Sequence, residues 1–235
     1  MRKIAIIGCG INGVGCAIAL AESGYDVHIF DKKEPFSETS SKSSKLLHGG
    51  IRYLENGHLS LVRESLQERA AWVEQMPDHT KINRFFIPVY QNFSRNILVL
   101  FAGAKLYEIL AGKFSLGKSK FHGKKNTLKL NKSLRPEGLV GSVSYVDVQM
   151  DDVAISTQLL KKAKSMGVEI IDNTEVSKFD LAGNIDIGNR SIKYDFVVNA
   201  CGPWVKEALD KNRINTEYQI EHVRGSHIIV DKIIS

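Results

Sequence analysis

The chain has 235 residues, of which 43% are hydrophobic and 25% are charged, and its formal net charge is +6. These values are typical of a soluble globular protein with one large or two small domains, and no stretch approaches the ~20 apolar residues that span a bilayer. Three cysteines, none at metal-ligand spacing, exclude a disulfide framework and give no reason to expect a metal site. The residues Met-Arg-Lys lead straight into an apolar run without the features of a secretory signal, so we expect a cytoplasmic protein.

The first thirty residues predict a strand–helix–strand unit. Residues 3–7 form an apolar run before a glycine, which is typical of a buried parallel strand. Residues 12–23 are rich in small residues and stop at Gly24, as a helix does at its C-terminus. Residues 26–30 are a second apolar run, which ends at Asp31. The spacing indicates a βαβ unit of right-handed connection.

The α/β pattern is interrupted and then returns near residue 150. In chain order, the sequence predicts a polar loop (34–57), an amphipathic helix (59–73), a strand with Pro88 at a sheet edge or at a strand end (84–90), an apolar helix (97–110), a lysine-rich segment (113–132), a helix (151–166), a strand (168–171), an antiparallel meander (177–195) and two strands (196–199 and 220–230). We therefore predict an α/β fold: a Rossmann-like, doubly wound sheet with an inserted, partly antiparallel second domain.

The turn after the first strand carries a nucleotide-binding pattern. The residues Gly8, Gly10 and Gly13 fit G-x-G-x-x-G, with Asn12 beginning the helix. The first glycine allows the tight turn, the second lets a pyrophosphate approach the backbone, and the third lets the helix pack on the strand. Asp31 can accept hydrogen bonds from ribose hydroxyls. The alternative is a glycine turn without a ligand, and the pattern itself does not separate NAD from FAD.

Hydroxyl groups and two glycines dominate the next segment, TSSKSSKLLHGGIRYLE at residues 39–55. Serine hydroxyls can donate to pyrophosphate or flavin oxygens, and adjacent glycines leave room for a flat ring against the backbone. By composition alone, a mobile Ser/Lys/Gly loop is the alternative.

This segment closely resembles the flavin-contacting segment of the FAD-dependent glycerol-3-phosphate dehydrogenases, which form a family with the glycerophosphate oxidases among the D-amino-acid-oxidase-like flavoproteins. The segments VNACGPW (198–204), VRGSHIIV (223–230) and TEV (174–176) also resemble that family. The resemblance is close over 1–76 and 140–231 and loose between them. This sequence departs from the family at Asp31, Cys201 and Arg224, where glutamate, threonine or another small residue, and lysine are usual.

The resemblance implies an FAD site and the N-terminal part of a longer chain, truncated at its C-terminus. An FAD-binding domain would comprise residues 1–76 and 150–205, and residues 77–149 and 206–235 would form part of a substrate or cap domain. The expected cofactor contacts are Gly8, Gly10, Asn12, Gly13, Asp31, Ser40, Ser41, Ser44, Lys45, Leu46, His48, Gly49, Gly50, Val176 (through its backbone), Ala200 and Gly202.

The resemblance also implies oxidation of sn-glycerol 3-phosphate to dihydroxyacetone phosphate. Arg52 is our candidate phosphate anchor and Tyr53 its hydroxyl partner, because arginine offers a bidentate fork to a phosphate. The alternative for Arg52 is a surface pair with Glu55. His227 is our candidate for a base or orienting group, and its alternative is a structural role on a strand. His48 is expected to pack against the flavin segment rather than to act as the base.

The acceptor of the electrons is expected to be a quinone or another electron acceptor. Seven lysines at 113–132, next to the apolar helix, could rest on anionic lipid at the cytoplasmic face of a membrane; a solvated basic loop is the alternative. The segment has few aromatic residues and no recognised module, so we expect no nucleic acid partner. Two other functions stay open: a related oxidase acting on an amine or a 2-hydroxy acid, and a flavin-binding fragment without turnover.

Overall fold

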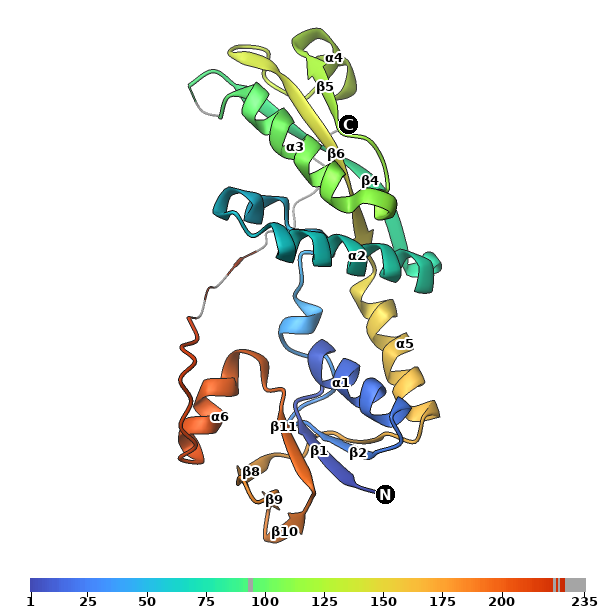
Figure 1. The fold of residues 1–235 in the computed structure, drawn as a ribbon, viewed down its shortest axis with the longest axis vertical. Coiled ribbons are helices and arrows are strands. Elements are labelled where there is room, and N and C mark those ends of the chain that lie inside the picture. The colour runs from blue at the N-terminus through green and yellow to red at the C-terminus, as the bar shows by residue number, and fades with distance from the viewer. Residues whose placement is uncertain (93–94, 222, 224, 227–235) are drawn as a thin grey trace. The chain divides into compact units, whose positions relative to one another are not determined.

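The computed structural model describes residues 1–92, 95–221, 223 and 225–226. Their contacts divide the chain into two compact units, which are described one at a time (Figure 1). The first unit comprises Met1–Ser44 and Asp152–Ser226. The described part of the second unit is residues 45–92 and 95–151.

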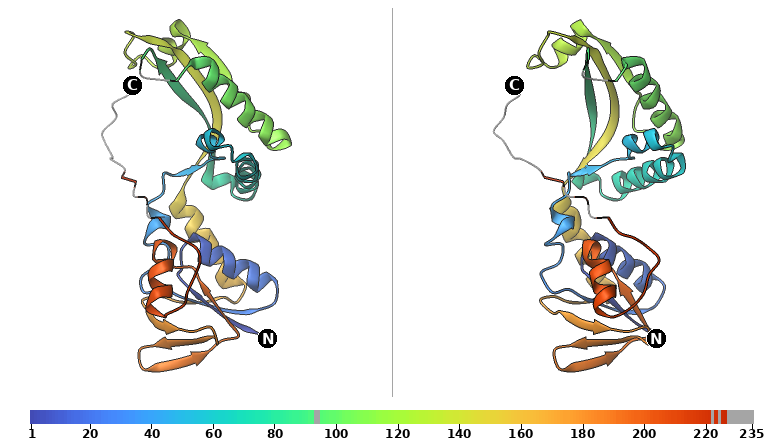
Figure 2. Two further views of the ribbon diagram at one scale, coloured as in Figure 1. Left: turned by 60° about the vertical axis from the view of Figure 1, so that its left-hand side comes forward. Right: turned by 90° about the vertical axis from the view of Figure 1, so that its left-hand side faces the viewer.

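A four-stranded parallel sheet forms the centre of the first unit. Its strands are β1 (Lys3–Ile7), β2 (Asp26–Phe30), β7 (Glu169–Ile171) and β11 (Phe196–Asn199), in the order β11-β1-β2-β7. Helix α1 (Ile11–Glu22) packs on β2 and beside helix α5 (Asp152–Ser165), as two views show (Figures 1 and 2). These elements confirm the predicted α/β class with its Rossmann-like sheet.

A three-stranded antiparallel sheet completes the core of the first unit. Its strands are β8 (Val176–Phe179), β9 (Asn184–Ile187) and β10 (Arg190–Lys193), as the meander pattern predicts. Phe179 and Ile185 pack with Phe30 of the parallel sheet in one hydrophobic cluster. The short helices η5 (Gly202–Trp204) and α6 (Val205–Lys211) follow β11, and α6 packs against the same cluster.

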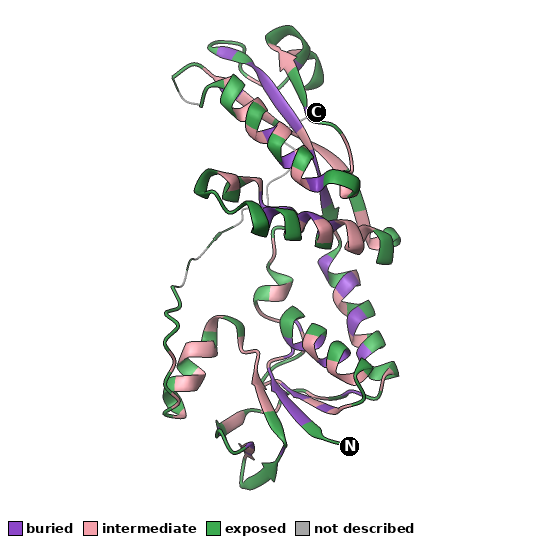
Figure 3. Cartoon of the chain, viewed as in Figure 1, coloured by how far each residue is buried: buried purple, intermediate pink, exposed green. Residues whose placement is uncertain are grey.

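The second unit is an antiparallel sheet covered by two helices. Strand β6 (Leu139–Met150) pairs with β4 (Thr80–Tyr90) on one side and with β3 (Leu46–Leu47) and β5 (Lys120–Gly123) on the other. Helices α2 (Leu59–Gln75) and α3 (Ile97–Ala111) pack on each other, and α3 also packs on β6. Figure 3 shows buried residues along β6, the central strand. The shorter helices of the chain are η1 (Thr39–Ser41), η2 (Ile51–Asn56), η3 (Pro77–His79), η4 (Gly112–Phe114) and α4 (Lys124–Leu130).

The two units divide the chain at other residues than the predicted FAD-binding and substrate domains, whose bounds stay predictions. Residues 45–76 lie in the second unit, because β3 pairs with β6 and α2 packs against α3. Residues 206–226 lie in the first unit, where α6 packs against the cluster that contains Phe30 and Phe179. The roles of FAD-binding and substrate domain stay predictions.

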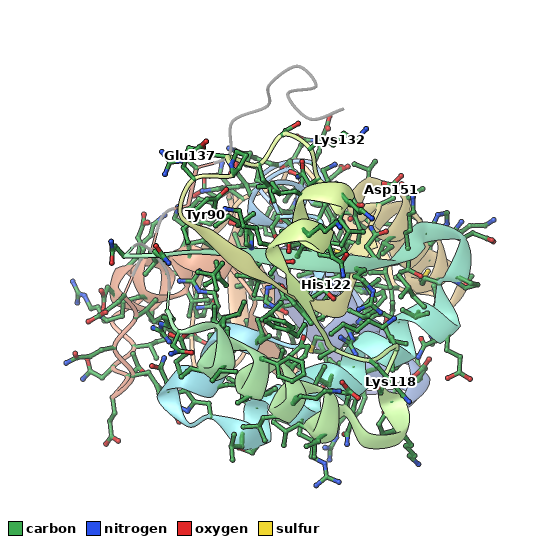
Figure 4. The ribbon with its side chains drawn as sticks, turned by 90° about the horizontal axis from the view of Figure 1, so that it is seen from above. Tyr90, Lys118, His122, Lys132, Glu137 and Asp151 are labelled. Carbon is green, nitrogen blue, oxygen red and sulfur yellow. The ribbon has the colours of Figure 1, made fainter. Side chains whose placement is uncertain are left out.

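The lysine-rich segment 113–132 is not one solvated loop. It contains β5, which pairs with β6, and the short helix α4. Figure 4 shows Lys118, His122 and Lys132 well separated along it. Pro88 lies in β4, which pairs only with β6 among the described strands, so its predicted edge position is confirmed. Most of the predicted strand 220–230 lies outside the described residues.

Candidate functional site

The carboxyl ends of β1 and β11 mark the point where the strand order of the parallel sheet reverses. From β1 the chain proceeds to β2 and β7 on one side, and it returns to β11 on the other. The backbone N–H of Ala200, after β11, donates to the Ile7 carbonyl at 2.8 Å, and the N–H of Gly8 donates to the Phe30 carbonyl at 2.8 Å. In open α/β sheets, ligands bind at the strand carboxyl ends beside such a reversal.

The three glycines of the turn meet different surroundings. A Cβ at Gly8, whose φ is +110°, would overlap the carbonyl oxygen of Ala200, and a Cβ at Gly13 would overlap the carbonyl oxygen of Gly8. A Cβ at Gly10 would meet only the Ser40 hydroxyl, at 3.1 Å. The backbone of Gly10 is extended, with φ −85° and ψ −174°. The first and third glycines are therefore required by packing, whereas the second keeps a space open above the turn.

The N-terminus of α1 faces that space. Gly10 caps the helix without a side chain, and the hydroxyl of Ser40 accepts a hydrogen bond of 3.0 Å from the backbone N–H of Ile11. The unpaired N–H groups of a helix N-terminus and its dipole favour an anion. Asn12 is exposed in the first turn of the helix.

Asp31 connects the end of β2 to the glycine-rich turn. Its Oδ2 accepts a hydrogen bond of 2.6 Å from the N–H of Cys9, and its Oδ1 accepts one of 2.9 Å from the N–H of Lys33. Each carboxylate oxygen can accept a second bond, so the group keeps acceptor capacity for a ligand hydroxyl.

A cavity of about 190 Å³ lies at these strand ends within the first unit. Seven of the residues predicted to bind the cofactor line it: Gly8, Gly10, Asp31, Ser40, Val176, Ala200 and Gly202. Sequence reasoning gave no role to Lys32 and Trp204, which also line it, with the Lys32 ammonium 5.2 Å from the centroid of the Trp204 ring. The aromatic residue that follows the VNACGP run is the signal from which Trp204 could have been predicted to line the cavity.

Other predicted residues of the first unit do not line the cavity. Gly13 is buried inside α1. Ser41 donates its hydroxyl to the Glu38 carbonyl at 2.9 Å, and Ser44 is exposed. Burial raises the pKa of Cys9 to about 12 and that of Cys201 to about 11, with the Asp31 carboxylate adding to both shifts. Both thiols are thus protonated at neutral pH, as expected of cysteines that fill space.

The remaining described residues that were predicted to bind cofactor or substrate lie in the second unit, in and around β3 and η2. Lys45, Leu46 and His48 lead to Gly49 and Gly50, which are both buried. A Cβ at Gly49 would overlap Leu66 and approach the Tyr107 hydroxyl to 2.6 Å, and a Cβ at Gly50, whose φ is +71°, would overlap the Tyr53 ring. Packing inside the second unit therefore requires glycine at both positions, and their contact with a flavin ring stays a prediction.

A buried polar cluster lies behind Gly49. The N–H of Gly49 donates to the hydroxyl oxygen of Tyr107 at 2.7 Å, and the Tyr107 hydroxyl is 3.0 Å from Oδ2 of Asp147. Arg69 donates from its Nη1 to Oδ1 of Asp147 at 2.8 Å. Burial raises the pKa of Tyr107 and that of Asp147, and the Arg69 guanidinium acts against both shifts. Sequence reasoning assigned no function to these residues.

The guanidinium of Arg52 is exposed, as is Tyr53. Glu55, the alternative partner of Arg52, instead forms an ion pair with Arg95. Among the described residues, no hydrogen bond or ion pair engages the Arg52 side chain. His227 lies outside the described residues. Within the part of the chain that the structure describes, no group of three or more His, Cys, Asp or Glu side chains could hold a metal ion, and no helix is long and apolar enough to cross a membrane.

Comparisons with known proteins agree with this geometry. A family model described as FAD dependent oxidoreductase matches residues 3–235. An aerobic glycerol-3-phosphate dehydrogenase of Staphylococcus saprophyticus is 31% identical over 97% of this chain and 43% of its own length, and one of Staphylococcus aureus is 30% identical over the same shares. The chain thus spans less than half the length of these curated relatives.

Solved structures show the same fold. A glycerol-3-phosphate dehydrogenase from Bacillus halodurans complexed with FAD superposes with a TM-score of 0.66 at 23% identity, over 91% of this chain and 36% of its own. An L-alpha-glycerophosphate oxidase from Mycoplasma pneumoniae with FAD bound gives a TM-score of 0.72 at 21% identity, over 90% and 57%. An L-proline dehydrogenase from P. horikoshii gives 0.74 at 20% identity, over 94% and 58%. At these identities the likeness shows the fold alone.

Proposed function

The chain belongs to the family of FAD-dependent oxidoreductases. From this family we propose that the first unit binds the ADP half of FAD, and that the protein oxidises sn-glycerol 3-phosphate to dihydroxyacetone phosphate. The substrate is proposed because the curated relatives are named as aerobic glycerol-3-phosphate dehydrogenases. Those relatives are more than twice as long as the matched region, so we propose that turnover requires the equivalent of their remaining part.

The open space above Gly10 is the observation that carries the cofactor assignment. It is bounded by the N-terminus of α1, which favours a pyrophosphate, and by Asp31, which can accept from a ribose hydroxyl. Val176 lines the same cavity where the β8–β9 ladder is irregular, between Val176 and Lys178. The residues present therefore fit the ADP half of FAD. When bound, FAD supplies the acceptor for the hydride that leaves C2 of the substrate.

Arg52 supports the substrate assignment. Because Glu55 is paired with Arg95, the Arg52 guanidinium can present its planar pair of donors to a phosphate. Tyr53 is the hydroxyl proposed beside it. His227 is proposed as the group that takes or orients the C2 hydroxyl proton, by its place in the VRGSHIIV segment. His48 is exposed, and we propose that it contacts the flavin rather than serving as the base.

A quinone in a membrane is the proposed electron acceptor, and α3 supports it. The exposed fractions of Leu98, Val99 and Ile109 on this helix are 69%, 60% and 71%, and Lys113 lies in η4, which follows the helix. Apolar side chains next to lysines suit a peripheral contact with anionic lipid. Sedimentation with anionic and with neutral vesicles tests the contact, and a chain that sediments with neither would contradict it.

Turnover assays on the protein carrying the equivalent of the relatives' full length test the reaction. We expect reduction of a soluble quinone analogue with glycerol 3-phosphate, and little peroxide. Peroxide release with glycine, proline or lactate, and no response to glycerol 3-phosphate, would instead identify an oxidase acting on an amine or a 2-hydroxy acid. Bound FAD without turnover of any of these would identify a flavin-binding module.

A further inference from the structure

Three elements of the second unit converge on one backbone N–H of the Gly49-Gly50 segment. Arg69 from α2, Tyr107 from α3 and Asp147 from β6 have exposed fractions of 3%, 3% and 2%. The Arg69 guanidinium also donates to the Val146 carbonyl at 3.0 Å and lies 5.8 Å from the centroid of the Tyr107 ring. These contacts hold the three side chains in a single arrangement behind Gly49.

The positions of the protons in this cluster follow from its chemistry. A backbone N–H can only donate, so the Tyr107 oxygen accepts from Gly49. The Tyr107 hydroxyl must then direct its own proton to the Asp147 carboxylate, 3.0 Å away. Because the carboxylate is charged and shielded from water, it polarises the hydroxyl and strengthens the bond from Gly49. Arg69 balances the charge of Asp147.

The bond to Tyr107 fixes the peptide between His48 and Gly49. The chain has no cis peptide bonds among its described residues, and in a trans peptide the C=O points opposite to the N–H. The carbonyl of His48 is therefore directed away from the buried cluster. We infer that Tyr107, backed by Asp147 and Arg69, is a positioning residue that sets this peptide and the Gly49-Gly50 backbone for the flavin; the inference rests on the proposed FAD site.

A role in stability alone does not account for the cluster. A buried ion pair can often be replaced by apolar side chains without loss of stability. Here the ion pair of Arg69 and Asp147 continues through the Tyr107 hydroxyl to the backbone N–H of Gly49. The Nε of Arg69 is buried without a hydrogen-bond partner among the described residues. The cluster therefore uses its polar groups to fix the direction of one peptide.

The test compares Tyr107→Phe with Tyr145→Phe in the full chain loaded with FAD. Both changes remove one tyrosine hydroxyl, and the two rings lie 5.9 Å apart between centroids, but only the hydroxyl of Tyr107 bonds to Gly49. We expect Tyr107→Phe to weaken FAD binding about tenfold, as the loss of one hydrogen bond does, and to shift the visible flavin absorbance bands. Tyr145→Phe should keep the wild-type affinity and bands.

Val62→Ala creates a cavity in the hydrophobic cluster that also contains Tyr107, so it is the control for a loss of stability alone. If it lowers the thermal midpoint as far as Tyr107→Phe does and shifts the bands equally, the positioning role is contradicted. Wild-type affinity and bands in Tyr107→Phe would contradict it too. Should Tyr107→Phe fail to fold, Asp147→Asn is judged by the same readouts, with a smaller shift expected. Wild-type chain that binds no FAD would contradict the proposed function itself.

Discussion

The backbone N–H of Cys9 donates a hydrogen bond of 2.6 Å to Oδ2 of Asp31, which ties the glycine-rich turn to the end of β2. The two residues are 22 positions apart, and the bond forms because β1 and β2 are adjacent parallel strands whose carboxyl ends meet. Asp31 thus shapes the turn as well as offering an acceptor to a ligand.

Asp31→Ala should therefore reduce both stability and cofactor affinity. Loss of the part-buried hydrogen bond from Cys9 to this charged group predicts a decrease of about 1.5–3 kcal/mol in the free energy of unfolding, and loss of the ligand acceptor predicts at least a tenfold weaker binding of FAD. Denaturant unfolding and FAD titration measure the two effects. Asp26→Ala, at the opposite end of the same strand, is the control and should leave the FAD affinity unchanged. Equal affinities in the two variants would contradict the role of Asp31.

Gly10→Val should abolish FAD binding while the fold persists. The backbone of Gly10 is extended, so a side chain is tolerated, but it would fill the space that a pyrophosphate must approach. We expect affinity to fall by more than a hundredfold, because two charge-assisted hydrogen bonds of about 1.5–3 kcal/mol each would be lost. Gly13→Ala is the contrasting variant: it should lower the thermal midpoint, because its Cβ overlaps the Gly8 carbonyl. Normal flavin content in folded Gly10→Val would show that the turn is structural only.

Arg52→Lys tests the substrate assignment in the protein with its complete pocket. Lysine keeps the charge but not the planar pair of donors, so the Michaelis constant for glycerol 3-phosphate should rise roughly tenfold or more. The FAD content and any turnover of unphosphorylated glycerol should stay as they are. Arg95→Lys, which alters the partner of Glu55 instead, should leave the Michaelis constant unchanged. An unaltered constant in Arg52→Lys would mean that Arg52 is not the phosphate anchor.

His122 predicts a dependence of stability on pH. Its pKa is lowered by burial and by the positive charges of Arg84 and Lys120, and its Nε2 lies 2.9 Å from the Ser144 hydroxyl. The folded state therefore binds this proton more weakly than the unfolded state does. The stability that this provides is present above the ordinary pKa of ~6.5 and is lost as the pH falls through the lowered pKa of the folded state. Between pH 7.5 and 5, the thermal midpoint of wild type should fall further than that of His122→Asn; equal falls would contradict this.

Local patterns in the sequence were sufficient to predict the βαβ unit and the meander of the first unit, but not helix α6. The strand and helix periods of residues 3–30 and the antiparallel meander pattern of residues 177–195 act within short distances along the chain, and the structure confirms both. The Gly8–Gly13 turn and Asp31 meet because adjacent parallel strands bring their ends together, which the βαβ spacing already implies.

The second unit depended on long-range pairing that no local pattern contains. Strand β6 pairs with three other strands. Strand β5, from the lysine-rich segment, forms by pairing with β6. The cluster of Arg69, Tyr107 and Asp147 joins residues up to 78 positions apart. One signal was present: Arg69 lies three residues after Leu66 on the apolar face of α2, and a charge on such a face points to a buried partner.

Titration of the purified chain with FAD and with NAD tests the central claim most directly, because both dinucleotides fit the glycine turn but only one belongs to the family. The account predicts a yellow protein that retains FAD at about one molecule per chain and releases it on denaturation, with no measurable affinity for NAD. A colourless, folded protein that binds NAD and does not bind FAD would contradict it.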